Sequence, residues 1–87
     1  MANTKSAEKQ ARRSIVRQER NRALRSRMRT AVKKVRAAVA AGDRSSAEVA
    51  LKEAVSVVDA TVTKGVIHAN TAARTKSRLT VAVSDLA

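Results

Sequence analysis

The N-terminal part of this chain carries an unusual concentration of positive side chains. Neither glycine nor proline occurs between residues 5 and 36, and the acids in that run are Glu8 and Glu19. Residues 1–40 have a net charge of +11, whereas residues 41–87 have a net charge of +1. A localised positive field of this strength is typical of a surface that binds a polyanion. The thirteen basic residues of this run are Lys5, Lys9, Arg12, Arg13, Arg17, Arg20, Arg22, Arg25, Arg27, Arg29, Lys33, Lys34 and Arg36.

The charge pattern of the basic run differs from that of an ordinary solvated helix face. A solvated face usually mixes both signs, as residues 43–59 do. The basic run hardly mixes them, so it predicts contacts to the phosphates of a nucleic acid. The chain has no Phe, Trp or Tyr on which unpaired bases could stack. We therefore expect contacts to phosphate, sugar and the shape of the nucleic acid.

A second, smaller basic group lies near the C-terminus, in a stretch from residue 64 to residue 84 that contains no acid. Charge patterning alone leaves two interpretations of this group open. It is either a solvated polar face or a second surface for the polyanion. The group consists of Lys64, Arg74, Lys76 and Arg78.

The residues that usually perform catalysis or bind metals are scarce. His68 is the single histidine of the chain, and there is no cysteine. A metal site needs several such ligands, and a nucleophilic hydroxyl needs a positioned base, so neither is expected. His68 is interpreted as a capping or surface group at a helix start. We expect no enzyme, no cofactor, no metal site and no small-molecule substrate.

The elements that must position these side chains are predicted to be three helices in one domain, residues 1–87. Gly42 and Gly65 stand where glycine commonly ends a helix, which divides the chain into helices of about residues 6–41, 44–63 and 67–86. Asp43, or Ser45 with Glu48, can cap the second helix. The core should be thin because Val, Ala, Leu, Ile and Met supply all of the apolar side chains.

The apolar positions of the second and third helices recur every three or four residues. The Val-rich part, residues 55–62, could favour a strand, but its apolar positions do not alternate strictly, so helix is predicted. The expected apolar faces are Ala47, Leu51, Ala54, Val55, Val58 and Val62 in the second helix, and Ala72, Leu79, Ala82, Val83 and Leu86 in the third.

The first helix should serve two purposes along its length. Its C-terminal half has an apolar stripe, but the same face carries arginines toward the N-terminus. We therefore expect an all-α three-helix bundle with a long basic N-terminal helix, ~54 Å in length, that projects beyond the bundle. The projecting half should fray in the free protein and order on a phosphate surface. The stripe is Leu24, Met28, Ala31, Val35 and Ala38, and the arginines that continue its face are Arg20, Arg17 and Arg13.

Other kinds of basic helix fit the sequence less well. Residues 21–29 superficially resemble the basic region of a leucine-zipper protein, but Gly42 and Asp43 interrupt the helix before several heptads can form. A membrane-surface helix would be expected to carry Trp or Phe anchors, which are absent. No apolar run reaches the ~20 residues of a membrane span, and no secretory signal is visible. A cytosolic protein without a membrane partner is predicted.

Short motifs occur in a fixed order around the two glycines: residues 1–9 (MANTKSAEK), 27–30 (RMRT), 33–35 (KKV), 41–43 (AGD) and 64–79 (KGVIHANTAARTKSRL). In these motifs the whole chain closely resembles the family of bacterial small-subunit ribosomal protein S twenty. The resemblance implies a three-helix bundle with a long N-terminal helix that binds 16S ribosomal RNA directly. It also implies a cytoplasmic, ribosome-associated protein that bridges RNA segments early in assembly of the small subunit, beside other subunit components and without catalysis.

The resemblance also implies which residues face the RNA. In the first helix these are Lys5, Lys9, Asn21, Arg25, Arg29, Lys33 and Lys34, and at the third helix they are His68, Asn70, Arg74, Lys76 and Ser77. Together with Arg12, Arg13, Arg17, Arg20, Arg22 and Arg27 of the basic run, and Arg78 of the second group, they form the predicted RNA-binding set. The main alternative is a basic DNA-binding protein of the nucleoid or regulatory type.

Overall fold

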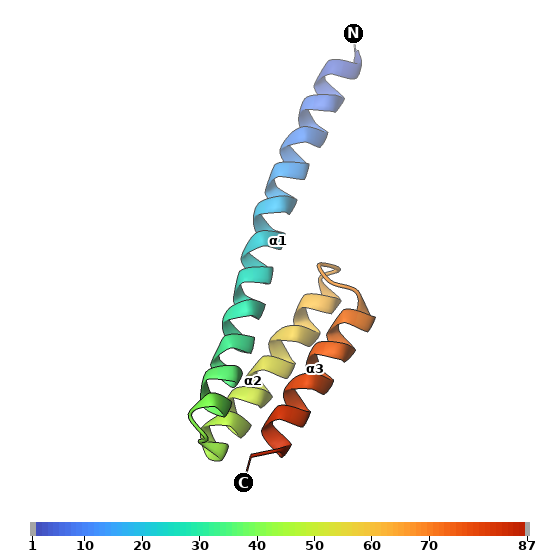
Figure 1. Ribbon diagram of the computed structural model, residues 1–87. Coiled ribbons are helices and arrows are strands. Elements are labelled where there is room, and N and C mark those ends of the chain that lie inside the picture. Colours follow the sequence, from blue (N-terminus) through green and yellow to red (C-terminus); the bar gives the residue numbers. More distant parts are fainter. Residues whose placement is uncertain (1, 87) are drawn as a thin grey trace.

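The computed structural model describes the backbone of residues 2–86 and the side chains of residues 5–86. This part of the chain forms three α-helices and no strand: α1, Ala2–Ala40; α2, Arg44–Thr63; and α3, Ala69–Ser84 (Figure 1). The all-α fold with a long first helix, predicted from the sequence, is confirmed. The helix α2 has the expected bounds, whereas α1 begins four residues earlier than expected and α3 begins two residues later.

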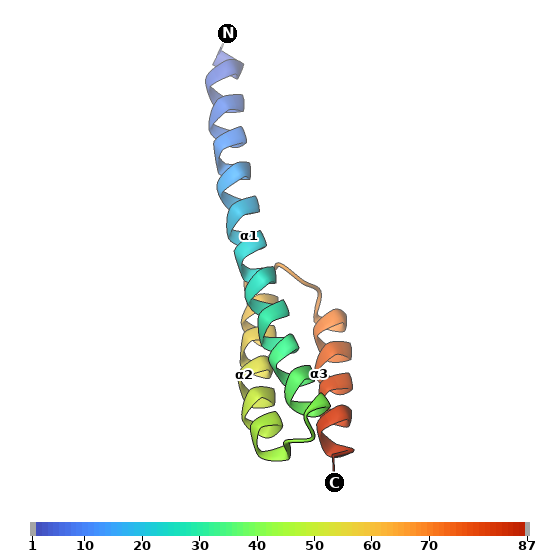
Figure 2. The ribbon, with the colours of Figure 1, turned by 60° about the vertical axis from the view of Figure 1, so that its left-hand side comes forward.

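The three helices pack only along part of α1. Its C-terminal half lies beside α2 and α3, and its N-terminal half extends alone beyond them (Figures 1 and 2). The molecule is therefore elongated, with principal extents of 67 × 21 × 14 Å. At 1.5 Å per residue the 39 residues of α1 span ~58 Å, which accounts for most of this length.

Both glycines end a helix in the left-handed conformation that the sequence predicts for them. Gly42 has a φ of 72°, and its N–H donates to the Val39 carbonyl at 3.0 Å, while the Asp43 N–H donates to the Ala38 carbonyl at 3.1 Å. These two bonds form a Schellman motif, which satisfies carbonyls that the helix end would otherwise leave unpaired. The same pair of bonds ends α2 at Gly65, whose φ is 74°.

The helix α2 is capped by Asp43, the first of the two possibilities that the sequence left open. One carboxylate oxygen accepts from the Ser46 N–H at 3.1 Å and the other accepts from the Ser46 hydroxyl at 2.8 Å. Glu48 does not close a capping box with Ser45, because its carboxylate pairs with Arg44 at 3.2 Å. The bonds from Ser46 lower the pKa of Asp43 below its ordinary value.

The core is small, as expected. Its central cluster of buried residues draws on all three helices, with Val35 from α1 and Leu79 from α3 among its largest side chains. The predicted apolar faces of α2 and α3 are buried or half-buried throughout. Met28, expected in the core, is only half-buried. It is not among the residues that pack against the central cluster.

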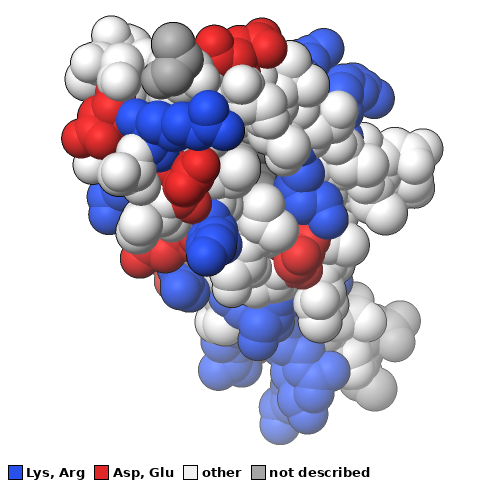
Figure 3. Space-filling view, turned by 90° about the horizontal axis from the view of Figure 1, so that it is seen from below, with Lys and Arg blue, Asp and Glu red and all other residues white. Residues whose placement is uncertain are grey.

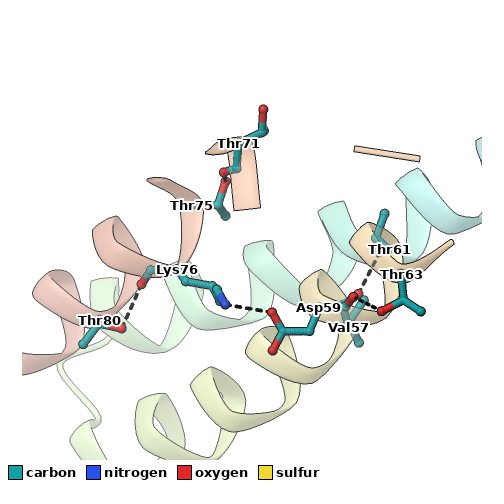
Figure 4. A network of polar contacts seen from close by, with 8 residues as sticks. All are labelled: Val57, Asp59, Thr61, Thr63, Thr71, Thr75, Lys76 and Thr80. Atoms are coloured by element: carbon teal, nitrogen blue, oxygen red, sulfur yellow. Dashed lines mark hydrogen bonds and ion pairs between the residues drawn. The ribbon is translucent and has the colours of Figure 1, made fainter. Parts of the chain in front are cut away.

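Threonine hydroxyls within α2 and α3 are satisfied by their own helices (Figure 4). Thr61 is buried, and its hydroxyl donates to the Val57 carbonyl at 2.7 Å. Thr75 and Thr80 make the equivalent bond to the carbonyl four residues earlier, at 2.9 and 2.8 Å. Each bond gives the hydroxyl a partner within its own helix. The helices therefore accommodate threonine, which otherwise favours strands. Residues 55–62 are helical, as predicted.

Candidate nucleic-acid interface

Residues 5–20 of α1, here called the arm, have no part in the core. Every side chain of the arm is exposed, including the apolar Ile15 and Val16, which are 55% and 66% exposed. Six of the predicted RNA-binding residues lie here, and all of them extend into solvent. They are Lys5, Lys9, Arg12, Arg13, Arg17 and Arg20.

Five of these arm residues lie along one side of α1, around a shallow depression on the helix surface. We call this side the arm surface; it consists of Lys9, Arg12, Arg13, Arg17 and Arg20. A second basic depression lies farther along α1, and we call it the shoulder surface. It is lined by Gln18, Asn21, Arg22, Arg25, Ser26 and Arg29.

The arm surface and the shoulder surface face in different directions. At ~100° per residue, their basic side chains centre roughly 180° apart around the axis of α1. A single ligand surface cannot lie flat against both. The sequence predicted one basic helix, and the structure divides its charge between two faces of that helix.

Asn21 differs from its basic neighbours on the shoulder surface. Its side-chain oxygen is buried and has no hydrogen-bond partner within the described part of the chain. A buried acceptor without a donor costs roughly 1–3 kcal/mol, and a donor from a bound partner can reach this oxygen only after the side chain rotates. Asn21 belongs to the RNA-binding set that the family resemblance implied, and that role stays a prediction.

A cleft of about 450 Å³ with a mixed polar and apolar lining lies between α1 and α2. Arg27 and Lys34 line it from α1, and Glu53 and Ser56 line it from α2. The two cations were predicted to face RNA, whereas Glu53 was not singled out from the sequence. No local signal could have placed this carboxylate beside the basic run, because its position depends on how α1 and α2 pack.

The second basic group lies on α3 and is built around the start of that helix. His68 caps α3 by accepting the Asn70 N–H on its Nδ1 atom at 3.0 Å, the role its position suggested. Asn70, Arg74, Ser77 and Arg78 are exposed. At ~100° per residue these four share one side of α3. This side offers two guanidinium groups with hydrogen-bonding neighbours.

Lys76 is placed differently from the other basic residues of α3. Its Nζ atom lies 2.8 Å from an Asp59 carboxylate oxygen on α2 (Figure 4). Side chains this exposed form a pair worth about 0.2–1 kcal/mol, because water screens the charges. The pair joins α2 to α3 and partly neutralises Lys76. In this structure Lys76 therefore serves as a contact between two helices.

Charges of both signs gather at the end of the bundle that is remote from the arm. Figure 3 views the molecule from that end, with Asp and Glu interspersed among Lys and Arg on the nearer surface and basic side chains beyond them. Five of the seven acids of the chain lie in residues 43–85. The positive field is therefore strongest along α1.

Within residues 2–86 no three His, Cys, Asp or Glu side chains gather in a way that could hold a metal ion. In the same part of the chain, no helix has the length and apolar content to cross a membrane.

Comparison with known proteins relates nearly the whole chain to one family. Residues 2–84 match the family described as Ribosomal protein S20. The chain is 57% identical over 83 residues to a protein of Nitrosomonas europaea, an alignment that covers 95% of each chain. It is 52% identical over 87 residues to a protein of Ralstonia pickettii, covering 100% of this chain and 99% of the relative. Both relatives are named Small ribosomal subunit protein bS20.

Proposed function

Because the chain belongs to the ribosomal protein S20 family, we propose that it binds 16S ribosomal RNA directly and supports assembly of the small subunit. Membership makes the chain a structural ribosomal protein rather than an enzyme. Its place of action is the ribosome, in the cytoplasm, among the components of the small subunit. Direct binding to 16S RNA depends on the chemistry of the two surfaces of α1.

The observation that carries the proposal is the exposed positive charge of the arm, which has six Lys or Arg side chains against Glu8 and Glu19. Its basic side chains pack against no other helix and extend into solvent. Neither of the two ion pairs within residues 5–86 involves the arm or the shoulder surface. These cations are therefore available to phosphates, and binding them releases the counterions that surround the RNA.

The opposed directions of the arm and shoulder surfaces explain how a single helix can act in assembly. Each surface can neutralise the phosphates of a different RNA segment, so that α1 lies between two segments that would otherwise repel each other. The exposed side of α3, with Arg74 and Arg78, supplies a further contact. On the arm and shoulder surfaces, contacts are made to phosphate, sugar and groove shape, since the chain has no aromatic side chain for stacking.

The decisive experiment compares binding of the full chain to 16S ribosomal RNA and to duplex DNA of random sequence at physiological salt. We expect clear preference for the RNA, with log K falling against log salt as for ~6 or more phosphates. Equal affinity for the two nucleic acids would favour a basic DNA-binding protein instead. A nearly salt-independent affinity would contradict phosphate neutralisation as the source of binding.

A further inference from the structure

The cleft between α1 and α2 combines groups that a simple phosphate-binding surface would not contain. Arg27 and Lys34 supply positive charge from α1, while Glu53 places a carboxylate opposite them. The two ion pairs of the described side chains are Arg44 with Glu48 and Lys76 with Asp59, so Glu53 is bound in neither. A carboxylate that faces a polyanion raises the free energy of binding unless the bound molecule offers it hydrogen-bond donors.

The position of the cleft makes it accessible to RNA that follows α1. Arg20 of the arm surface, Arg27 and Lys34 succeed one another at intervals of seven residues. Residues seven apart on a helix differ by only ~20° around the axis, so these three lie on nearly one side of α1. An RNA strand that follows the arm surface toward the bundle therefore meets the cleft.

We propose that this cleft binds one unpaired guanine nucleotide of the RNA, with Glu53 accepting hydrogen bonds from the base. The proposal rests on the RNA-binding function inferred above. Arg27 and Lys34 hold the sugar-phosphate, and the Arg27 guanidinium offers a flat surface to the base. The cleft, at about 450 Å³, lies within the roughly 300–1,000 Å³ of typical small-ligand sites.

The choice of base follows from the chemistry of a carboxylate. An ionised carboxylate only accepts hydrogen bonds, and its two oxygens suit two parallel donors. The Watson–Crick edge of guanine carries two adjacent donors, N1–H and the N2 amino group. Adenine, cytosine and uracil each present one donor group on that edge, beside acceptors that a carboxylate repels. Guanine is therefore the base that Glu53 selects.

The direction in which RNA affinity changes when Glu53 loses its charge distinguishes a base contact from a carboxylate that is only solvated. Removing any acid from a protein that binds a polyanion should raise affinity slightly, through the weaker repulsion of phosphates. Glu48→Gln is the matched control, because Glu48 lies on the same helix and pairs with Arg44 outside the cleft. We expect Glu48→Gln to show the small gain. Glu53→Gln should instead lower affinity for 16S RNA about tenfold or more, the value of one lost bidentate base contact.

Chemical probing of the same complexes tests the identity of the base. Kethoxal modifies unpaired guanines at N1 and N2, the atoms that Glu53 is proposed to contact. One guanine of 16S RNA should be protected in the wild-type complex and reactive in the Glu53→Gln complex, with the other protections unchanged. Circular dichroism melts of both variants verify that the fold is retained.

Each outcome of these measurements has one meaning. A gain in affinity for Glu53→Gln equal to that of Glu48→Gln would overturn the proposal. So would a loss of affinity without any guanine becoming reactive. Failure of the wild-type chain to prefer 16S RNA over duplex DNA would reject the RNA-binding function itself. This comparison is therefore made before any variant is measured.

Discussion

The two halves of α1 share one helix but differ in what stabilises them. In the half beside α2 and α3, Val35 is completely buried and belongs to the core cluster. In the arm, the largest apolar side chains, Ile15 and Val16, are mostly exposed, and closely spaced arginines repel one another. Tertiary packing supplies most of the stability of a protein helix, so a continuous helix does not imply uniform stability. The arm therefore depends for its stability on the RNA that we propose it binds.

Amide hydrogen exchange of the free protein should show the largest difference between these halves. Amides near Val35 should exchange only when the bundle unfolds, since they lie in the packed part of α1. Amides from Arg13 to Arg20 should exchange nearly as fast as in an unfolded peptide, because nothing packs on them. Strong protection of Arg13 to Arg20 in a monomer would contradict this division of α1. Addition of 16S RNA should slow exchange in the arm.

Matched apolar substitutions in the two halves should give the next largest difference. Val35→Ala removes two buried methyl groups and should lower the free energy of unfolding by about 1.5–3 kcal/mol. Ile15→Ala should change it by less than about 0.5 kcal/mol, because the side chain is exposed and alanine favours helix. Urea unfolding followed by circular dichroism measures both. A loss for Ile15→Ala as large as that for Val35→Ala would show that the arm packs on something in the free protein.

The fold was largely predictable because its signals are local. Gly42 and Gly65 end helices by a backbone conformation that glycine adopts easily, and both were placed correctly. Asp43 and His68 cap the helices that follow them, and capping depends only on neighbours in sequence. Met28 was assigned to the core but is only half-buried, because burial depends on how the helices pack, which no residue near Met28 determines.

The candidate site was predictable in its charge and not in its geometry. Composition alone identified the basic run, because a net positive charge this localised is typical of a surface that binds a polyanion. The pairing of Lys76 with Asp59 and the position of Glu53 opposite Arg27 both depend on the packing of two helices. Sequence patterns describe one helix at a time, so contacts between helices escaped them.

A smaller effect is expected when single charges are removed from the arm. Arg17→Ala should weaken binding to 16S RNA and reduce the slope of log K against log salt by about one phosphate. The free energy of unfolding should hardly change, because Arg17 is exposed in the free protein. Met28→Ala provides the contrast, since it should reduce stability modestly and leave the salt slope unaltered. If Arg17→Ala destabilised the free protein more than Met28→Ala, the arm would have a structural role that its exposure does not suggest.

The smallest expected effect is a change in how the stability of the bundle depends on pH. Hydrogen bonds from the Ser46 N–H and hydroxyl hold the pKa of Asp43 below its ordinary value. A carboxylate whose pKa is lower in the folded state stabilises that state at pH values above its unfolded pKa. This contribution is lost as the pH falls through the lowered folded pKa, because the protonated carboxyl accepts the Ser46 N–H less well.

The variant Asp43→Asn retains a capping oxygen but does not titrate. Its free energy of unfolding should be slightly lower at neutral pH and should depend less on pH in the acid range. Urea unfolding of both proteins between neutral and strongly acidic pH measures the difference, and identical pH profiles would show that the Asp43 cap contributes no pH dependence. No titrating capping residue is found among the described side chains of the arm. Amide exchange in the arm should therefore be the same in Asp43→Asn as in the wild-type protein.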